Sequence, residues 1–197
     1  SWCPFFFEDM KQGNRESLRE KAGNFLELFT VLSVGFVLLA SEVYRYVYVS
    51  RDFWGSTMLI PIFVSSYYTN FLCTFPVNFE YYHKKTKVVS IITIVSSLIN
   101  VGLNYLLILR IGMAGAAVAT LISHSLQLTL HYMYVRFALG GKEYPFPLKM
   151  WVGYAAVFAA VAVASVAADG LWLARWGLGA AVGLWELLRI RKRKVLI

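Results

Sequence analysis

The sequence has few charged residues and very few cysteines for its length. Only 15% of the 197 residues are Asp, Glu, Lys or Arg, whereas about a quarter is usual in soluble domains. The two cysteines, Cys3 and Cys73, have neither a CxxC motif nor a histidine at ligand spacing, which argues against a metal centre or a disulfide. The sequence also lacks a glycine-rich phosphate loop, HExxH, GxSxG and a paired-carboxylate cluster. We therefore expect no enzyme activity, no metal and no cofactor.

Long runs without charge are abundant. Hydrophobic residues make up 58% of the chain. Residues 88–109 contain no formal charge, and residues 111–135 contain only two histidines as titratable groups. Each run reaches the ~20 residues that a helix needs to cross a bilayer. The sequence therefore predicts an all-α integral membrane protein, a polytopic helix bundle in contact with lipid.

Six membrane spans are expected, at about residues 24–49, 53–79, 88–109, 111–135, 150–168 and 171–188. A charged connecting segment, 1–23, precedes this transmembrane lobe of residues 24–188, and a basic tail, 189–197, follows it. Ser17 and Glu20 have capping-box spacing, so a helix is expected to begin near Ser17. Pro61 and Pro76 predict a kink or break in the second span.

The distribution of basic residues predicts the orientation. Fifteen Lys and Arg lie in the connecting segment, in the second–third and fourth–fifth loops and in the tail, and four lie elsewhere. Because cytoplasmic loops are enriched in Lys and Arg, both ends of this chain are predicted to be cytoplasmic. The same distribution explains the net charge of +8 without a nucleic-acid partner, since no soluble module is left to present a basic face.

Polar residues recur within the third span. Ser96, Asn100 and Asn104 follow one another at a spacing of four, on one face of the expected helix. Such a stripe either lines a hydrated path for a polar substrate or makes hydrogen bonds to a neighbouring helix. The sequence leaves both alternatives open.

Small residues in the fourth and sixth spans predict close helix packing. In the fourth span they form two series at a spacing of four: Gly112, Ala116 and Thr120, and Gly115, Ala119 and Ser123. In the sixth span they are Gly179 and Gly183.

The end of the second span carries further polar candidates. Glu80 and His83 are either a substrate-contact or coupling site, or interfacial residues paired with the adjacent lysines. Tyr67 and Tyr68 either stack on sugar rings or anchor the helix. His124 and His131 lie seven apart on one helical face, a spacing that favours a packing role over ligation.

Several of these features occur together in a known family. The stretches NFEYYHKKTK and INVGLNYLLILRIGMAGAAVAT, with CPFFFEDMKQGNRESLREK near the start, resemble the C-terminal half of Wzx-type polysaccharide flippases. These flippases belong to the multidrug/oligosaccharidyl-lipid/polysaccharide (MOP) exporter superfamily. The resemblance covers roughly residues 1–150, whereas the remainder matches only as two apolar spans and a basic tail.

The resemblance implies one lobe of a two-lobed transporter in a bacterial inner membrane. It would move undecaprenyl-diphosphate-linked oligosaccharides between leaflets by alternating access, for surface polysaccharide biosynthesis. Since the chain begins at Ser1 rather than Met, the N-terminal lobe is expected to be missing from it. One alternative is a multidrug or small-cation efflux transporter of the same superfamily. A further alternative, a membrane-embedded polysaccharide polymerase or acyltransferase, is disfavoured by the short outer loops.

Overall fold

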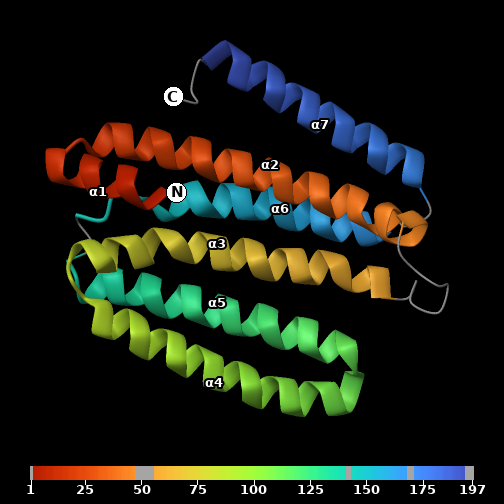
Figure 1. The fold of residues 1–197 in the computed structure, drawn as a ribbon, viewed down its shortest axis with the longest axis horizontal. Coiled ribbons are helices and arrows are strands. Elements are labelled where there is room, and N and C mark those ends of the chain that lie inside the picture. Colours follow the sequence, from red (N-terminus) through yellow and green to blue (C-terminus); the bar gives the residue numbers. More distant parts are fainter. Residues whose placement is uncertain (1, 48–55, 141–142, 168–170, 194–197) are drawn as a thin grey trace. The chain divides into compact units, whose positions relative to one another are not determined.

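The structure is a computed structural model that describes residues 2–47, 56–140, 143–167 and 171–193. These residues form helices and connecting turns, with no strand among them. Figure 1 shows the order of the helices along the chain: α1 (Trp2–Gln12), α2 (Arg15–Val47), α3 (Ile60–Tyr82), α4 (Thr86–Ile111), α5 (Met113–Phe137), α6 (Leu148–Ala167) and α7 (Trp172–Arg193). The expected all-α class is confirmed.

Five helical segments are long and apolar enough to cross a membrane. They are Arg15–Ala40, Ser56–Tyr82, Thr86–Ile111, Met113–Phe137 and Leu148–Val166. These are the helices of a multi-pass membrane protein, and they correspond to the first five predicted spans. The sixth predicted span is helical as α7, but α7 carries Arg175, Glu186 and a basic end and is not among the five. A count of six spans therefore stays a prediction.

The chain divides into two compact units. Unit 1 comprises residues 1–24 and 66–152, and unit 2 comprises residues 25–65 and 153–197. The divisions fall inside α2, α3 and α6. Each unit is described separately.

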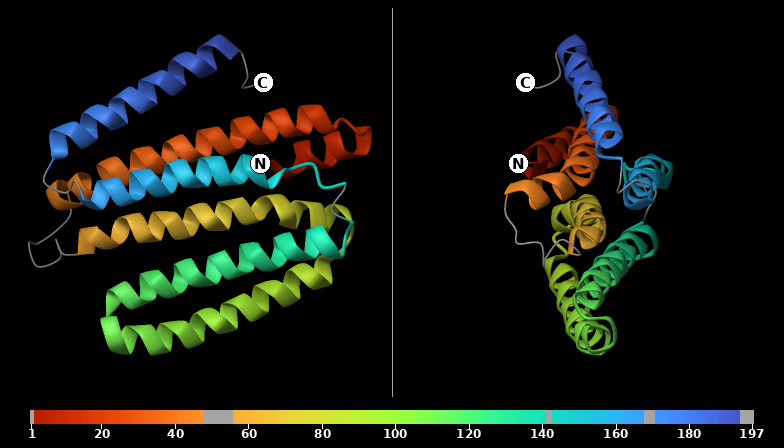
Figure 2. Two further views of the ribbon diagram at one scale, coloured as in Figure 1. Left: turned by 180° about the vertical axis from the view of Figure 1, so that it is seen from behind. Right: turned by 90° about the vertical axis from the view of Figure 1, so that its right-hand side faces the viewer.

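In unit 1, α4 and α5 form an antiparallel hairpin (Figures 1 and 2). Gly112 alone separates the two helices, with φ 59° and ψ −138°, a conformation that side-chain-bearing residues avoid. Its N–H donates to the carbonyl of Ile108, so the last turn of α4 is closed. The predicted hairpin is confirmed, and the role of Gly112 is to make the turn. No atom lies within 4 Å of a Cβ built on Gly112, so the packing role predicted for it was wrong.

The connecting segment begins with a helix, which the sequence did not predict. Gly13, at φ 69°, ends α1, and the backbone N–H groups of Gly13 and Asn14 donate to the carbonyls of Met10 and Asp9 in the last turn of that helix. Asn14 then caps α2, because its Oδ1 accepts from the N–H of Ser17 at 3.2 Å. The expected helix start near Ser17 agrees with α2, which begins at Arg15, but the capping residue is Asn14 rather than Ser17.

The prolines do not break α3, which is helical throughout Ile60–Tyr82. Pro61 lies in the first turn, where a backbone donor is not needed, and Pro76 lies inside the helix. The C-terminus of α3 is closed by Lys84 in a left-handed conformation, φ 58°. The N–H groups of Lys84 and Lys85 donate to the carbonyls of Tyr81 and Glu80, which is the usual geometry of a helix end that has glycine at this position.

Unit 2 contains the longer part of α2, the start of α3, most of α6 and α7. Val37, Leu38, Phe158 and Ala162 are among its buried apolar side chains. Arg175, near the start of α7, is buried, and its Nη2 donates to the carbonyl of Val37 at 3.3 Å. This contact joins α7 to α2.

Candidate functional site

The predicted polar stripe on α4 faces α5. Asn100 Nδ2 donates to Ser123 Oγ at 3.2 Å, and Ser123 in turn donates to the carbonyl of Ala119. Asn104 Nδ2 lies 2.9 Å from Asn100 Oδ1. Ser96 is buried, and its Oγ has no hydrogen-bond partner among the described residues. Asn100 therefore makes an interhelical hydrogen bond, and both asparagines stay partly accessible.

One of the two small-residue series brings α4 and α5 together. Gly115, Ala119 and Ser123 are buried, whereas Ala116 and Thr120 of the other series are only partly buried. A Cβ placed on Gly115 would lie 2.3 Å from the carbonyl oxygen of Leu107. Only glycine fits this contact, since such a distance is far below van der Waals separation. The close-packing role that the sequence predicts for Gly115 agrees with this geometry.

The outward surface of α4 is apolar. Leu98, Val101, Tyr105 and Leu109 are exposed by 67–72%. A row of large apolar side chains is unusual on a soluble surface and fits a lipid-facing helix.

The most polar buried contact in unit 1 joins α3 to α5. His131 Nδ1 lies 2.9 Å and 3.0 Å from the two carboxylate oxygens of Glu80. Both side chains are 0% exposed. The predicted pairing of Glu80 with Lys84 and Lys85 was wrong. The carboxylate of Glu80 is buried inside unit 1, where it contacts the imidazole of His131.

A cluster of aromatic rings centred on Tyr144 lies near this pair. The ring of Tyr144, from the loop between α5 and α6, contacts those of Phe79, Tyr132 and Trp151 at centroid distances of 5.2, 6.3 and 6.0 Å. Three buried polar atoms here have no hydrogen-bond partner among the described residues: His131 Nε2, Tyr144 Oη and Trp151 Nε1.

The hydroxyl of Tyr144 is buried away from water. Burial raises the pKa of Tyr144 well above its ordinary value, and Tyr132, Cys73 and Glu80 raise it further. The hydroxyl is therefore protonated at physiological pH, and it remains a potential donor beside the carboxylate.

His83 is separate from the buried pair. Its ring packs on Phe79 at a centroid distance of 4.4 Å, and its Nε2 lies 4.0 Å from a carboxylate oxygen of Glu143. The side chain of Glu143 is 64% exposed, so this contact lies at the surface. Glu80 and His83 therefore do not form one site.

The two candidate tyrosines, Tyr67 and Tyr68, also lie in different environments. Tyr67 is 64% exposed, whereas Tyr68 is buried. Next to them, Ser66 Oγ lies 2.9 Å from His124 Nδ1. His124 and His131 thus both contact α3, two helical turns apart on α5, which agrees with the packing role predicted from their spacing.

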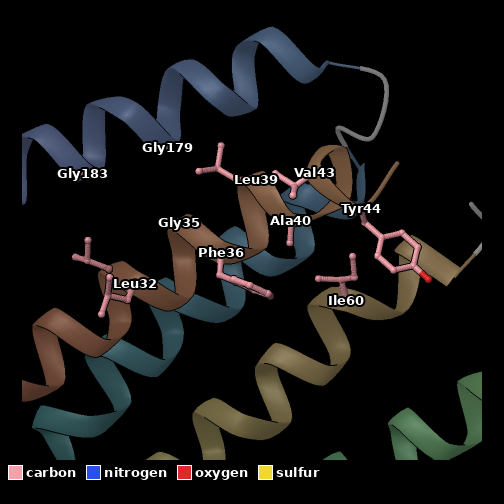
Figure 3. A pocket seen from close by; sticks show the side chains of 11 residues that line it. Leu32, Gly35, Phe36, Leu39, Ala40, Val43, Tyr44, Ile60, Gly179 and Gly183 are labelled. Atoms are coloured by element: carbon pink, nitrogen blue, oxygen red, sulfur yellow. The ribbon is translucent and has the colours of Figure 1, made fainter. Parts of the chain in front are cut away.

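Unit 2 contains an apolar groove of about 670 Å³. Its walls come from α2, the start of α3 and α7, as Figure 3 shows. The lining residues are Val31, Leu32, Gly35, Phe36, Leu39, Ala40, Val43, Tyr44, Ile60, Gly179 and Gly183.

Gly179 and Gly183 of α7 both line this groove but differ in the space around them. A Cβ on Gly179 would lie 3.6 Å from Leu39 Cδ2, an ordinary contact. A Cβ on Gly183 would have no neighbour within 4 Å. Gly183 lines the groove, and the close packing that the sequence predicts there is wrong.

Sequence reasoning identified Glu80 as a candidate but missed its partner. A signal for the pair was present, because the predicted topology puts the ends of the second and fourth spans on the same side of the membrane. Glu80 and His131 lie near those two ends. Tyr144 had no comparable signal, since it lies in a loop. Among the described residues, no group of three His, Cys, Asp or Glu side chains is placed to hold a metal ion.

No family model matches the chain, and no curated protein or solved structure is significantly similar to it.

Proposed function

We propose that the chain is one lobe of a transporter that flips lipid-linked oligosaccharides across a bacterial inner membrane by alternating access. The observation that carries the proposal is the α4–α5 hairpin. Its residues carry the flippase-like sequence pattern. It combines an apolar outer face with Asn100, which donates to Ser123 of α5, and with Asn104, which donates to Asn100. A second lobe would complete the central cavity, because alternating access in transporters of this kind needs two repeats.

The buried pair supports transport as the class of function. An ionisable residue inside a membrane helix is costly and marks a functional site more often than a structural one. Glu80 lies within the span-length helix Ser56–Tyr82, and His131 lies within Met113–Phe137. The proposed topology has six spans with both ends in the cytoplasm, and the substrate is an undecaprenyl-diphosphate-linked repeat unit.

Deletion of the gene in the source organism tests the proposal. We expect surface polysaccharide to be lost and lipid-linked repeat units to accumulate in the cytoplasmic leaflet, with both restored by the complete gene. Unchanged polysaccharide in the deletion strain, together with lost efflux of cationic dyes, would favour the efflux alternative instead.

A matched pair of variants separates packing from transport on α4. Asn100 and Asn104 are replaced together by Leu, and Ser97, which is exposed and bonds only its own helix at the Thr93 carbonyl, is replaced by Leu as the control. If the asparagines contact substrate, the double variant folds and loses transport while the control keeps both. Intact transport in a folded double variant would assign the asparagines to packing alone.

A further inference from the structure

The Glu80–His131 pair differs from the other acid–base contacts of unit 1 in its isolation from solvent. Asp9 and Lys21 lie 2.8 Å apart, but the lysine side chain is 45% exposed. The contact between His83 and Glu143 is longer and more exposed. Of these three pairs, Glu80–His131 is the one in which both members are fully buried.

Burial restricts how many protons this pair can hold. A carboxyl and an imidazole that share one proton are together neutral, whether the proton lies on oxygen or on nitrogen. Removing that proton leaves a net negative charge, and adding a second leaves a net positive charge. Either net charge is expensive in an apolar interior, so the packed unit favours a single shared proton.

Cys73 from α3 and Tyr144 from the loop interact electrostatically with Glu80, and Tyr132 from α5 interacts with Tyr144. None of these three side chains carries a positive charge that would offset the loss of the shared proton. On α3, His83 lies beyond the Phe79 ring. From α2, the guanidinium Nε of Arg19 is directed to the carbonyl of Pro145.

The hydrogen bonding of His131 is also incomplete. A structural ion pair in a dry interior has the remaining donors of the imidazolium satisfied. Here Nε2 is fully buried and has no partner in the described part of the chain. The pair therefore lacks the second hydrogen bond that would hold a permanent imidazolium.

We propose that Glu80 and His131 form a proton-binding site that holds one proton between them while α3 and α5 are packed. Water that enters when this contact opens solvates both groups, so that a net charge on either of them is no longer costly. Proton binding is thereby linked to the packing of α3 on α5. The inference does not depend on the proposed substrate.

The sign of the linkage follows from the proton counts. When the pair is hydrated, the net charge left by deprotonation costs little, so the opened state releases the shared proton at lower pH than the packed state. Between these two pH values the packed state holds one proton more than the opened state. Packing is therefore weakened as pH rises, and the equilibrium constant for unfolding increases by up to tenfold per pH unit.

The first experiment observes the histidine in a folded chain. Nitrogen-15 NMR of the whole chain in lipid nanodiscs follows the imidazole signals from pH 6 to 8.5. Replacing His83 and His124 with Gln leaves His131 as the remaining histidine of the three. We expect its signals to stay constant over this range. Signals that follow the titration of a free imidazole would overturn the proposal.

The second experiment measures the linkage. Unfolding equilibria are compared across the same pH range for the unaltered chain, His131→Gln, Glu80→Gln and Asp9→Asn. The last is a control from the pair that solvent reaches at Lys21. We expect the pH slope to be reduced in whichever of the first two variants folds and to be retained in Asp9→Asn. Equal slopes in all folded proteins would overturn the proposal, whatever the outcome for polysaccharide export.

Discussion

Units 1 and 2 use glycine in opposite ways. In unit 1, Gly115 of α5 lies against the backbone of Leu107, where any side chain would collide. In unit 2, Gly183 of α7 faces a groove in which a Cβ would touch nothing. Both glycines belong to patterns of small residues at a spacing of four. The spacing of small residues therefore identifies a helix face that another helix can approach closely. Whether close packing occurs depends on the position of the neighbouring helix.

The two units also differ in how they hold buried charge. In unit 1 a carboxylate meets an imidazole from another helix. In unit 2 the buried Arg175 donates to a backbone carbonyl, a partner that has no titratable proton. The unit 1 contact can change its net charge through both of its members, which is why we assign proton binding there.

The largest predicted effect comes from breaking the buried pair. Glu80→Ala should destabilise the chain by about 3–5 kcal/mol, because it leaves the imidazole buried without its partner. Replacing both residues with apolar ones, Glu80→Met with His131→Leu, should recover most of that loss. Unfolding in bicelles measures both. Asp9→Asn, in the pair whose lysine is 45% exposed, should cost less than Glu80→Ala, and an equal cost there would remove the distinction between the pairs.

The second-largest predicted effect comes from adding a methyl group at Gly115, and it is compared with the same change at Gly183. Gly115→Ala should destabilise by about 1–3 kcal/mol, because the added methyl forces α4 and α5 apart. Gly183→Ala should be neutral or stabilising by up to about 1 kcal/mol, since alanine favours the helix and meets no neighbour. Thermal unfolding of the two variants in the same detergent tests this. A comparable loss of stability at Gly183 would show that α7 packs closely after all.

A smaller effect is expected at the hydrogen bond between α4 and α5. Asn100→Leu removes the bond to Ser123 and should cost roughly 0.6–2 kcal/mol. Ser97→Leu, whose hydroxyl bonds within α4, should change stability by less than about 0.5 kcal/mol. Unfolding measurements on Asn100→Leu, Ser123→Ala and the double variant give the coupling between the two residues. Additive effects would exclude a direct interaction.

The smallest predicted effect is a gain in stability. Lys84 has a left-handed backbone, which costs a side-chain-bearing residue about 1 kcal/mol, so Lys84→Gly should stabilise the end of α3 by a similar amount. Lys85, at φ −93°, is the control, and Lys85→Gly should give no such gain. Melting temperatures that fall for both variants would contradict the assigned turn.

Much of the fold follows from the sequence because charge-free runs of span length have few alternatives to a membrane helix. The α4–α5 hairpin was predictable because Arg110 and Gly112 interrupt two such runs. The helix α1 was not, since its apolar residues 2–7 are too few to span a membrane and are followed by a charged stretch. Its helical end depends on Gly13 and on the cap at Asn14.

The candidate site was only partly predictable. Glu80 stands next to basic residues in sequence, and local reasoning paired it with them. Its burial depends on α5 and on the loop that carries Tyr144 and Phe146, which are more than 50 residues away. These are tertiary contacts, and they cannot be predicted from the sequence of one membrane span. The asparagines of α4 were recognised as polar, but which helix they face became clear only from Ser123.

The proposed flipping of lipid-linked oligosaccharide is tested most directly by measuring the outer-leaflet fraction of the lipid-linked sugar. The measurement uses a strain of the source organism that has no second flippase gene of this class, with the gene for this chain deleted or restored. The account predicts that deletion abolishes the outer-leaflet signal and that the complete gene restores it. Transfer at an unchanged rate in the deletion strain would contradict the account.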